Sequence, residues 1–213
     1  MECCGGYDEV FTERQARWVR GRFERRGLTG PAREIVRWLG SRGLQEGVSV
    51  LEIGGGLGEL HVELLRRGAA RATSVELTGS WEREARRLLA AEGLEHRVER
   101  VLGDLVHQPD LAGQADVVVL NKVVCCYPDH AALLQAAGER ARRALVLSHP
   151  PRTPLVRAGL TVLNAWERLR GHDYRAYAHP PEQMLEELSA TGLRPVTSER
   201  AGLWWVQGLE PVA

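Results

Sequence analysis

Short apolar runs alternate with amphipathic segments of helical length along most of this chain. The run Val48–Ile53 contains β-branched residues and ends abruptly in glycines, as expected for a buried strand before a tight turn. The segment Glu59–Arg67 follows, with Leu60 and Leu64 one helical turn apart and Gly68 as its stop. Strand, glycine turn and helix form the first half of a βαβ unit.

The same alternation recurs to the end of the chain and predicts an α/β architecture. The run between Asp116 and Asn121 is apolar at every position, which is typical of a central parallel strand buried on both faces. Strands are predicted at 48–53, 70–75, 97–102, 116–121, 144–148, 195–199 and 203–207, and helices at 8–26, 32–39, 59–67, 79–91, 129–142 and 180–191, with a further apolar helical face inside an insertion at 152–180.

The glycine-rich turn at 54–58 has a use beyond ending the strand. Glycine lets a ligand approach the main chain closely, and the next helix offers unpaired N–H groups at its N-terminus. The spacing here is G-x-G-x-G with Glu59 next, whereas a dinucleotide-binding loop has G-x-G-x-x-G. Glu52 adds an acid two residues before the first glycine. The loop predicts a cradle for part of a nucleotide-like ligand; a turn that merely requires glycine is the alternative.

A second acid stands where the second strand ends. Glu76 comes 22 residues after Gly54, and Leu77 follows it. An acid at the carboxyl end of this strand is placed to accept hydrogen bonds from two ribose hydroxyls. A surface glutamate without that role is the alternative.

The segment Glu52-Ile-Gly-Gly-Gly-Leu-Gly58 resembles motif I of the class I S-adenosylmethionine-dependent methyltransferases. The resemblance covers about residues 48–208 and includes four motif positions in the family's order. It implies S-adenosylmethionine as cofactor and a Rossmann-like fold, in which helices cover both faces of a seven-stranded, mostly parallel sheet whose last strand is antiparallel. The cofactor contacts that it implies are Glu52, Gly54, Gly55, Gly56, Gly58, Glu76, Leu77, Gly103, Asp104, Leu105, Asn121, Lys122 and Val123.

The resemblance also implies roles for residues after the third and fourth strands. Asp104 would accept a hydrogen bond from the adenine amino group, with Leu105 packed on the ring. Asn121, Lys122 and Val123 would lie beside the methionine part of the cofactor, because open α/β sheets bind ligands at the carboxyl ends of their strands.

The family comparison further implies a division of the chain. Residues 1–46 would form a helical cap over the cofactor site, and residues 47–213 the methyltransferase domain, with the insertion at 152–180 near the active edge. Tyr7 and Arg14 could then reach the cofactor from the cap. Solvated helix residues without that role are an equal alternative.

Charge and the length of the apolar runs limit the kinds of binding partner that are expected. Lys+Arg and Asp+Glu number 28 each, so the net charge exerts no pull toward nucleic acid or an anionic membrane. Apolar runs stay short of the ~20 residues of a membrane span and the N-terminus lacks a signal-peptide pattern, so a cytoplasmic protein without membrane or nucleic-acid partners is expected. A homodimer is one assembly that the sequence leaves open.

The four cysteines form the adjacent pairs Cys3-Cys4 and Cys125-Cys126. Neither pair has the C-x-x-C spacing of zinc or redox sites. Free thiols and no metal are therefore expected, with a metal site or a disulfide between the pairs as the alternative.

Methyl transfer from a sulfonium mainly requires alignment of the reacting atoms, and a base only when the nucleophile is a hydroxyl or amine. His149 and Tyr127 are the candidate bases, with Asp129 and His179 nearby, although each could be a packing residue. The polar-Pro-Pro-aromatic motif of many amide N-methyltransferases is missing, because Asn121-Lys-Val-Val stands there. The sequence therefore favours a small-molecule acceptor methylated at oxygen.

Within the family, Ser148-His-Pro-Pro-Arg-Thr-Pro-Leu155 followed by a helix is similar to the magnesium-protoporphyrin O-methyltransferases. That local similarity implies an anionic carboxylate substrate, with Arg152 or Arg157 as its electrostatic partner and His179 as a further substrate contact. Two other functions stay open: an NAD(P)-dependent oxidoreductase, which the G-x-G-x-G spacing disfavours, and a non-catalytic S-adenosylmethionine-binding or interaction module.

Overall fold

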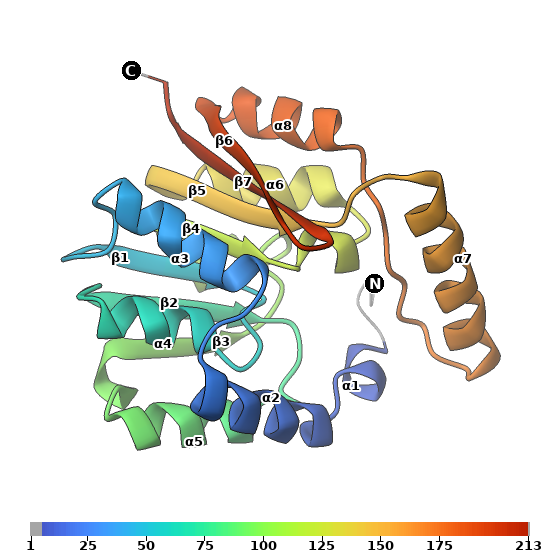
Figure 1. Cartoon of the computed structure of the whole chain (residues 1–213), viewed down its shortest axis with the longest axis horizontal. Coiled ribbons are helices and arrows are strands. Elements are labelled where there is room, and N and C mark those ends of the chain that lie inside the picture. Colours follow the sequence, from blue (N-terminus) through green and yellow to red (C-terminus); the bar gives the residue numbers. More distant parts are fainter. Residues whose placement is uncertain (1–5, 213) are drawn as a thin grey trace.

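A computed structural model describes residues 6–212 as a seven-stranded sheet with helices on both faces (Figure 1). The strands are β1 (Ser49–Ile53), β2 (Arg71–Glu76), β3 (Val98–Leu102), β4 (Ala115–Asn121), β5 (Ala141–His149), β6 (Leu193–Ala201) and β7 (Trp204–Pro211). Their order across the sheet is β3-β2-β1-β4-β5-β7-β6. Strands β1 to β5 pair in parallel, whereas β7 runs antiparallel to both β5 and β6. The predicted Rossmann-like sheet with an antiparallel last strand is confirmed.

Eight α-helices connect and cover these strands within the described residues. They are α1 (Tyr7–Val10), α2 (Glu13–Arg26), α3 (Pro31–Ser41), α4 (Glu59–Arg66), α5 (Glu82–Glu92), α6 (His130–Gly138), α7 (Pro154–Leu169) and α8 (Pro181–Ala190). Short 3-10 turns occupy Glu95–Arg97, Pro109–Leu111 and Val124–Cys126.

The alternation of side chains along β4 divides the core into two layers. Successive strand residues point to opposite faces, so Val117 and Val119 pack with the layer of α3, α4 and α5. Val118 and Leu120 pack with the layer that contains α6 and α8, on the other side of the sheet in Figure 1. Because both faces are covered, the centre of β4, Val117 to Leu120, has to be apolar, as its sequence is.

The N-terminal helix predicted at 8–26 is broken into two. Thr12 is extended and forms a capping box with Gln15, which starts α2 and separates it from the single turn of α1. α2 then lies along α5, where Arg20 Nε is 2.8 Å from the buried carboxylate of Glu84. The apolar periodicity alone predicts one continuous helix, whereas Thr12 and Gln15 carry the spacing of a capping box and mark the start of a second helix.

The ends of other helices and strands differ from the predicted ends by a few residues. The helix predicted to reach about Arg142 ends at Gly138, because β5 begins at Ala141, which pairs with Ala115. Asp129 caps that helix as expected, by accepting from the Ala132 N–H. Within residues 6–212, no helix is long and apolar enough to cross a membrane.

Candidate active site

A cavity of about 350 Å³ opens at the carboxyl ends of β1, β2 and β4. Its floor is the glycine turn after β1. Helices α1 and α2, from the N-terminal part of the chain, cover it. It is lined by Tyr7, Phe11, Trp18, Val19, Arg22, Gly54, Gly55, Gly56, Glu59, Glu76, Leu77, Thr78, Trp81, Asn121, Lys122, Val123, Cys126 and Tyr127. Nine of the predicted site residues are therefore brought together in one place.

The glycine turn has no room for side chains at two positions on the cavity side. Gly54 and Gly56 have φ of 65° and 61°, a region that side chains disfavour. A Cβ on Gly54 would lie 2.7 Å from Val123, and one on Gly56 would lie 3.0 Å from the Trp81 ring. A substituent at either position would narrow the cradle that the turn forms.

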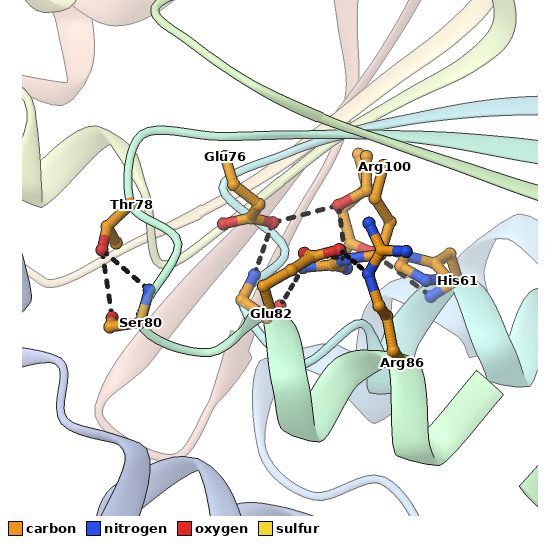
Figure 2. A network of polar contacts seen from close by, with 10 residues as sticks. His61, Glu76, Thr78, Ser80, Glu82, Arg86 and Arg100 are labelled. Atoms are coloured by element: carbon orange, nitrogen blue, oxygen red, sulfur yellow. Dashed lines mark hydrogen bonds and ion pairs between the residues drawn. The ribbon is translucent and has the colours of Figure 1, made fainter. Parts of the chain in front are cut away.

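A polar network fixes the glycine turn to the end of β2 (Figure 2). Glu76 Oε1 accepts hydrogen bonds from the Gly56 N–H at 2.7 Å and from Ser74 Oγ at 3.0 Å. Arg100 donates to the Gly56 carbonyl at 2.9 Å and to Glu82 at 2.8 Å. The Glu76 carboxylate thus faces the cavity from a position that neighbouring side chains hold.

Burial raises the pKa of Glu76 to about 8, although the nearby Arg100 charge acts to lower it. Glu76 is 6% exposed, so ionisation removes a charge from water. The pKa of Glu59, at the start of α4, is also raised by burial. Both carboxyl groups belong to the cavity wall.

Glu52 lies behind the glycine turn and is not among the residues that line the cavity. Its Oε2 is 2.6 Å from His61 Nδ1, and both side chains are buried. A Cβ on Gly55 would lie 2.6 Å from the Glu52 carboxyl carbon, and one on Gly58 would lie 2.3 Å from the His61 ring. Gly58 has φ of 88° and is likewise outside the lining. The Glu52–His61 pair therefore packs against the glycine turn from the side away from the cavity.

The residues after β3 form a second arrangement beside the cavity. Tyr127 donates its hydroxyl hydrogen to Asp104, with oxygen distances of 2.9 and 3.1 Å, and Tyr127 reaches the cavity wall. The Gly103 N–H binds the carbonyl of Glu76 at 2.8 Å, and Leu105 is buried in the core. Gly103, Asp104 and Leu105 are next to the lining residues without being among them.

The three residues predicted beside the methionine part, Asn121, Lys122 and Val123, all line the cavity. Lys122 has φ of 62°, the only positive φ of a non-glycine residue within 6–212, a strain that clusters at functional sites. Its N–H binds Ser148 Oγ at 2.9 Å, and Ser148 donates to Asn121 Oδ1 at 2.9 Å. Partial burial lowers the pKa of the Lys122 ammonium, and the Arg22 charge acts in the same direction.

More residues of the N-terminal cap line the cavity than the sequence predicted. Tyr7 lines the cavity as expected, whereas Arg14 is exposed and does not. Trp18 and Arg22, which lie one turn apart on α2, also line it. Their i, i+4 spacing was visible in the sequence, but which face of α2 meets the sheet depends on how α2 packs on α5.

The candidate base His149 is buried at the end of β5 and does not line the cavity. Its Nδ1 is 3.0 Å from the Pro150 carbonyl, and burial lowers its pKa. His179 lies 3.0 Å from the Tyr127 carbonyl and stacks on His130 at 4.2 Å. Both imidazoles are therefore held by neighbouring residues, and neither is among the residues that line the cavity.

The arginines proposed for substrate binding, Arg152 and Arg157, are exposed near and on α7 and are not cavity residues. Cys125 and Cys126 are free thiols with sulfur atoms 3.7 Å apart. Cys3-Cys4 lie outside the described residues, so a bond between the pairs stays untested. No group of three or more metal-ligating side chains occurs in 6–212.

Comparison with known proteins finds methyltransferases. Residues 50–145 match the family described as "Methyltransferase domain". A tuberculostearic acid methyltransferase of Mycobacterium tuberculosis is 46% identical over 92 residues, which are 43% of this chain and 21% of that protein. The chain thus spans about a fifth of the length of this curated relative.

Solved structures share the fold. Magnesium protoporphyrin IX methyltransferase from Synechocystis, solved with bound S-adenosylhomocysteine, has a TM-score of 0.69 and 23% identity, covering 85% of this chain and 82% of its own. An O-methyltransferase family protein from Burkholderia thailandensis has a TM-score of 0.73 and 18% identity, covering 94% and 60%.

These observations define a class I methyltransferase fold with a cavity at the carboxyl ends of the strands. Residues 50–145 are similar to the methyltransferase domain family, and the whole sheet has the fold of solved methyltransferases.

Proposed function

We propose that this chain transfers a methyl group from S-adenosylmethionine to a small molecule, at an oxygen atom. The observation that carries the proposal is the cavity above the glycine turn, with the Glu76 carboxylate at one side and the β4 end at the other. S-adenosylmethionine, when bound there, supplies a methyl group already activated on a sulfonium.

The cavity wall suits the two halves of this cofactor. Glu76 uses Oε1 for both of its contacts within the protein, so its carboxylate can accept from ribose hydroxyls. Gly54 and Gly56 leave space for the ligand against the main chain. Glu52 and Gly58 act by shaping the turn, and Asp104, held by Tyr127, would receive the adenine with Gly103 and Leu105 beside it.

Charges of both signs meet at the other end of the cavity. Arg22 and Glu59 approach to 3.8 Å, and Lys122 carries the only lysine ammonium of the sequence. An amino-acid tail has an ammonium and a carboxylate, so Glu59 and the two cations complement it. This arrangement supports the placing of the methionine part against Asn121, Lys122 and Val123.

Several features support an oxygen acceptor that is a small molecule. Solved proteins that share this fold include a mitomycin 7-O-methyltransferase and an O-methyltransferase family 2 protein in complex with apigenin. The cavity is lined by aromatic side chains of the cap, including Tyr7, Phe11 and Trp18. His149 lies outside the lining, and Tyr127 donates its hydroxyl hydrogen to Asp104. An acceptor such as a carboxylate, which needs no general base, therefore suits the site best.

The same reasoning supports the division of the chain. Residues of α1 and α2 in the proposed cap line the cavity, whereas α3 packs with the core of the sheet. We therefore assign the covering role within residues 1–46 to α1 and α2, and the insertion at 152–180 remains the candidate to contact the acceptor through Arg152, Arg157 or His179.

Calorimetry tests the cofactor class first. S-adenosylhomocysteine should bind the wild-type protein, and Glu76→Ala should weaken binding by about 1–3 kcal/mol, the scale for loss of a hydrogen-bonded charge. Glu92→Ala, which removes an exposed ion pair with Arg66, is the control and should bind normally. Binding of NAD(H) in place of the methyltransferase ligands would move the function to hydride transfer.

A scan of small acceptors then tests the reaction. Formation of S-adenosylhomocysteine with a carboxylate or phenol, and not with the corresponding amine, would support O-methylation. Tight cofactor binding without turnover of any acceptor class would favour the non-catalytic module.

A further inference from the structure

Helix α7 presents an apolar face that the rest of the described chain leaves uncovered. Eleven large apolar side chains are exposed within residues 6–212, and five of them lie on this helix: Leu155, Val162, Leu163, Trp166 and Leu169. Leu155 and Leu169 are each 83% exposed, and Trp166 is 58% exposed. Exposed apolar residues that occur singly are ordinary, whereas a contiguous group on one element indicates a binding surface.

The spacing of these residues places them in one row. Leu155, Val162, Trp166 and Leu169 follow one another at intervals of seven, four and three residues, which is one side of an α-helix. We call these four residues together with Leu163 the α7 apolar row.

A different side of α7 attaches the helix to the protein. Asn164 exchanges two hydrogen bonds of 2.9 Å with the main chain of Ala176, and the buried Glu167 lies 2.6 Å from His172 Nδ1. Because each helical residue turns by 100°, Asn164 points away from the α7 apolar row, and Glu167 lies at the edge of the row beside Leu163. Figure 1 shows α7 at the margin of the molecule, apart from the sheet and on the same side as α1.

The charges around α7 are separated from those of the remaining chain. Residues 150–178 contain five arginines and two acids, a net charge of +3, so the rest of the neutral 213-residue chain carries −3. One of the two acids is Glu167, which is buried against His172. Arg152 and Arg170 are exposed at the two ends of the α7 apolar row.

We propose that α7 docks this protein on the surface of a lipid bilayer that carries anionic headgroups. The α7 apolar row enters the boundary between headgroups and acyl chains, and the flanking arginines contact the headgroups. A second copy of the chain is a poorer occupant, because pairing two such helices face to face brings their arginines together. The zero net charge predicted no attraction of the whole chain, but the local charge of this segment supplies one.

Docking would bring the cavity close to the bilayer. The segment after α7 runs to the cavity wall, where Tyr174 packs against Phe11 with ring centres 5.7 Å apart and the Tyr177 N–H binds the Cys125 carbonyl at 2.7 Å. An amphiphilic acceptor held in the membrane would then be within the protein's reach. The docking itself does not depend on the proposed methyl transfer.

Co-sedimentation of the full chain with vesicles tests the proposal. Binding is expected to phosphatidylcholine vesicles that contain phosphatidylglycerol, and not to pure phosphatidylcholine, and added salt should weaken it. Trp166→Glu with Leu169→Glu should lower the affinity by about a hundredfold, since two large apolar side chains no longer enter the membrane. Arg152→Gln with Arg170→Gln should lower it about tenfold.

Matched controls separate this surface from general effects. Leu203→Glu changes a residue that is 75% exposed on the β6–β7 turn, and Arg143→Gln with Arg194→Gln removes two exposed charges elsewhere. Both controls should bind vesicles as the wild type does. If the Trp166 and Leu169 variant fails to fold, slower hydrogen exchange of residues 154–169 in the wild type on anionic vesicles gives the same information.

Equal binding with and without phosphatidylglycerol, or unchanged binding of the Trp166 and Leu169 variant, would overturn the proposal. So would a concentration-dependent dimer that this variant abolishes, since a second copy would then cover the row. These measurements contain no cofactor, so a failure here leaves the proposed function untouched, and a protein without methyltransferase activity can still pass them.

Discussion

At the residue scale, Glu76 shows how burial prepares a side chain for a ligand. An unfolded glutamate titrates near pH 4.5, whereas burial raises the folded pKa of Glu76 to about 8. Between these values the folded protein retains a proton that the unfolded chain has lost, so its contribution to stability is lost as the pH rises through this window. Ribose hydroxyls of a bound cofactor would donate hydrogen bonds to the carboxylate in place of the water that burial removes.

The first prediction follows from that proton. Binding of S-adenosylhomocysteine should tighten as the pH rises from 6 to 8, by up to about tenfold per pH unit, because the ligand selects the ionised carboxylate. Calorimetry across this range measures the slope. Glu76→Gln should bind weakly and lack this component, and it also corrects for titration of the ligand's own amino group. Identical slopes in the two proteins would show that Glu76 does not accept the ribose.

A second residue-scale prediction concerns Gly56. A valine there would meet the Trp81 ring, since even a Cβ lies 3.0 Å from it, and would force a positive φ on a β-branched residue. Gly56→Val should therefore lose cofactor binding while retaining the sheet, as seen by circular dichroism. Gly113→Val is the control, because nothing lies within 4 Å of its Cβ and its φ is not positive. A folded Gly56→Val protein with normal affinity would exclude the turn as the cofactor cradle.

At the scale of elements, the sequence predicted those whose signal is local. The apolar run of β4 and the turn from β1 into α4 follow from residue order alone, and the structure has them where expected. Glu52 illustrates the limit: the motif predicted a cofactor contact, but the buried His61 partner at 2.6 Å lies nine residues away on α4 and turns its carboxylate beneath the loop. A side chain's direction depends on such tertiary partners.

The cap helices show the same limit. The sequence predicted helix throughout 8–26. Which residues of α2 reach the cavity, however, depends on the contact of α2 with α5 through Arg20 and Glu84. That contact places Trp18 and Arg22 at the cavity, whereas Arg14 faces solvent. Arg14, Trp18 and Arg22 follow one another at intervals of four residues on one side of α2, so no local pattern shows which of them reach the cavity.

The capping box supplies a prediction at this scale. Thr12→Ala removes the side-chain acceptor at the start of α2 and should cost about 1 kcal/mol of unfolding free energy. It should also weaken cofactor binding, because Phe11 and Tyr7 precede this cap and line the cavity. Denaturant unfolding and calorimetry measure the two effects.

Thr153→Ala is the matched variant, since Thr153 caps α7 in the same way and lies outside the cavity lining. It should lose similar stability and keep normal affinity. If both variants lost affinity equally, the effect of Thr12 would be general destabilisation and α1 would have no covering role.

At the scale of the whole molecule, the cavity joins parts of the chain that are distant in sequence. Tyr7 and Trp18 come from the first 20 residues, the glycine turn and Glu76 from the first strands, and Lys122 from the end of β4. Tyr174 packs on Phe11 and Tyr7 from beyond α7. A ligand in this cavity therefore contacts segments that have to be folded together.

This arrangement predicts a single, ligand-dependent unfolding transition. At a concentration one hundred times its Kd, S-adenosylhomocysteine should add about 2.7 kcal/mol, which raises Tm by roughly 5–10 °C for a chain of this length. Because α3 is part of the sheet core and α2 is tied to α5 by a buried carboxylate, the cap and sheet should melt together. Calorimetric and van't Hoff enthalpies that agree, with and without ligand, would establish a single transition.

Glu76→Ala should reduce the rise in Tm at the same ligand concentration. An early transition of residues 7–26 that the ligand alone removes would mean instead that the cap folds over the site only when the cofactor is bound.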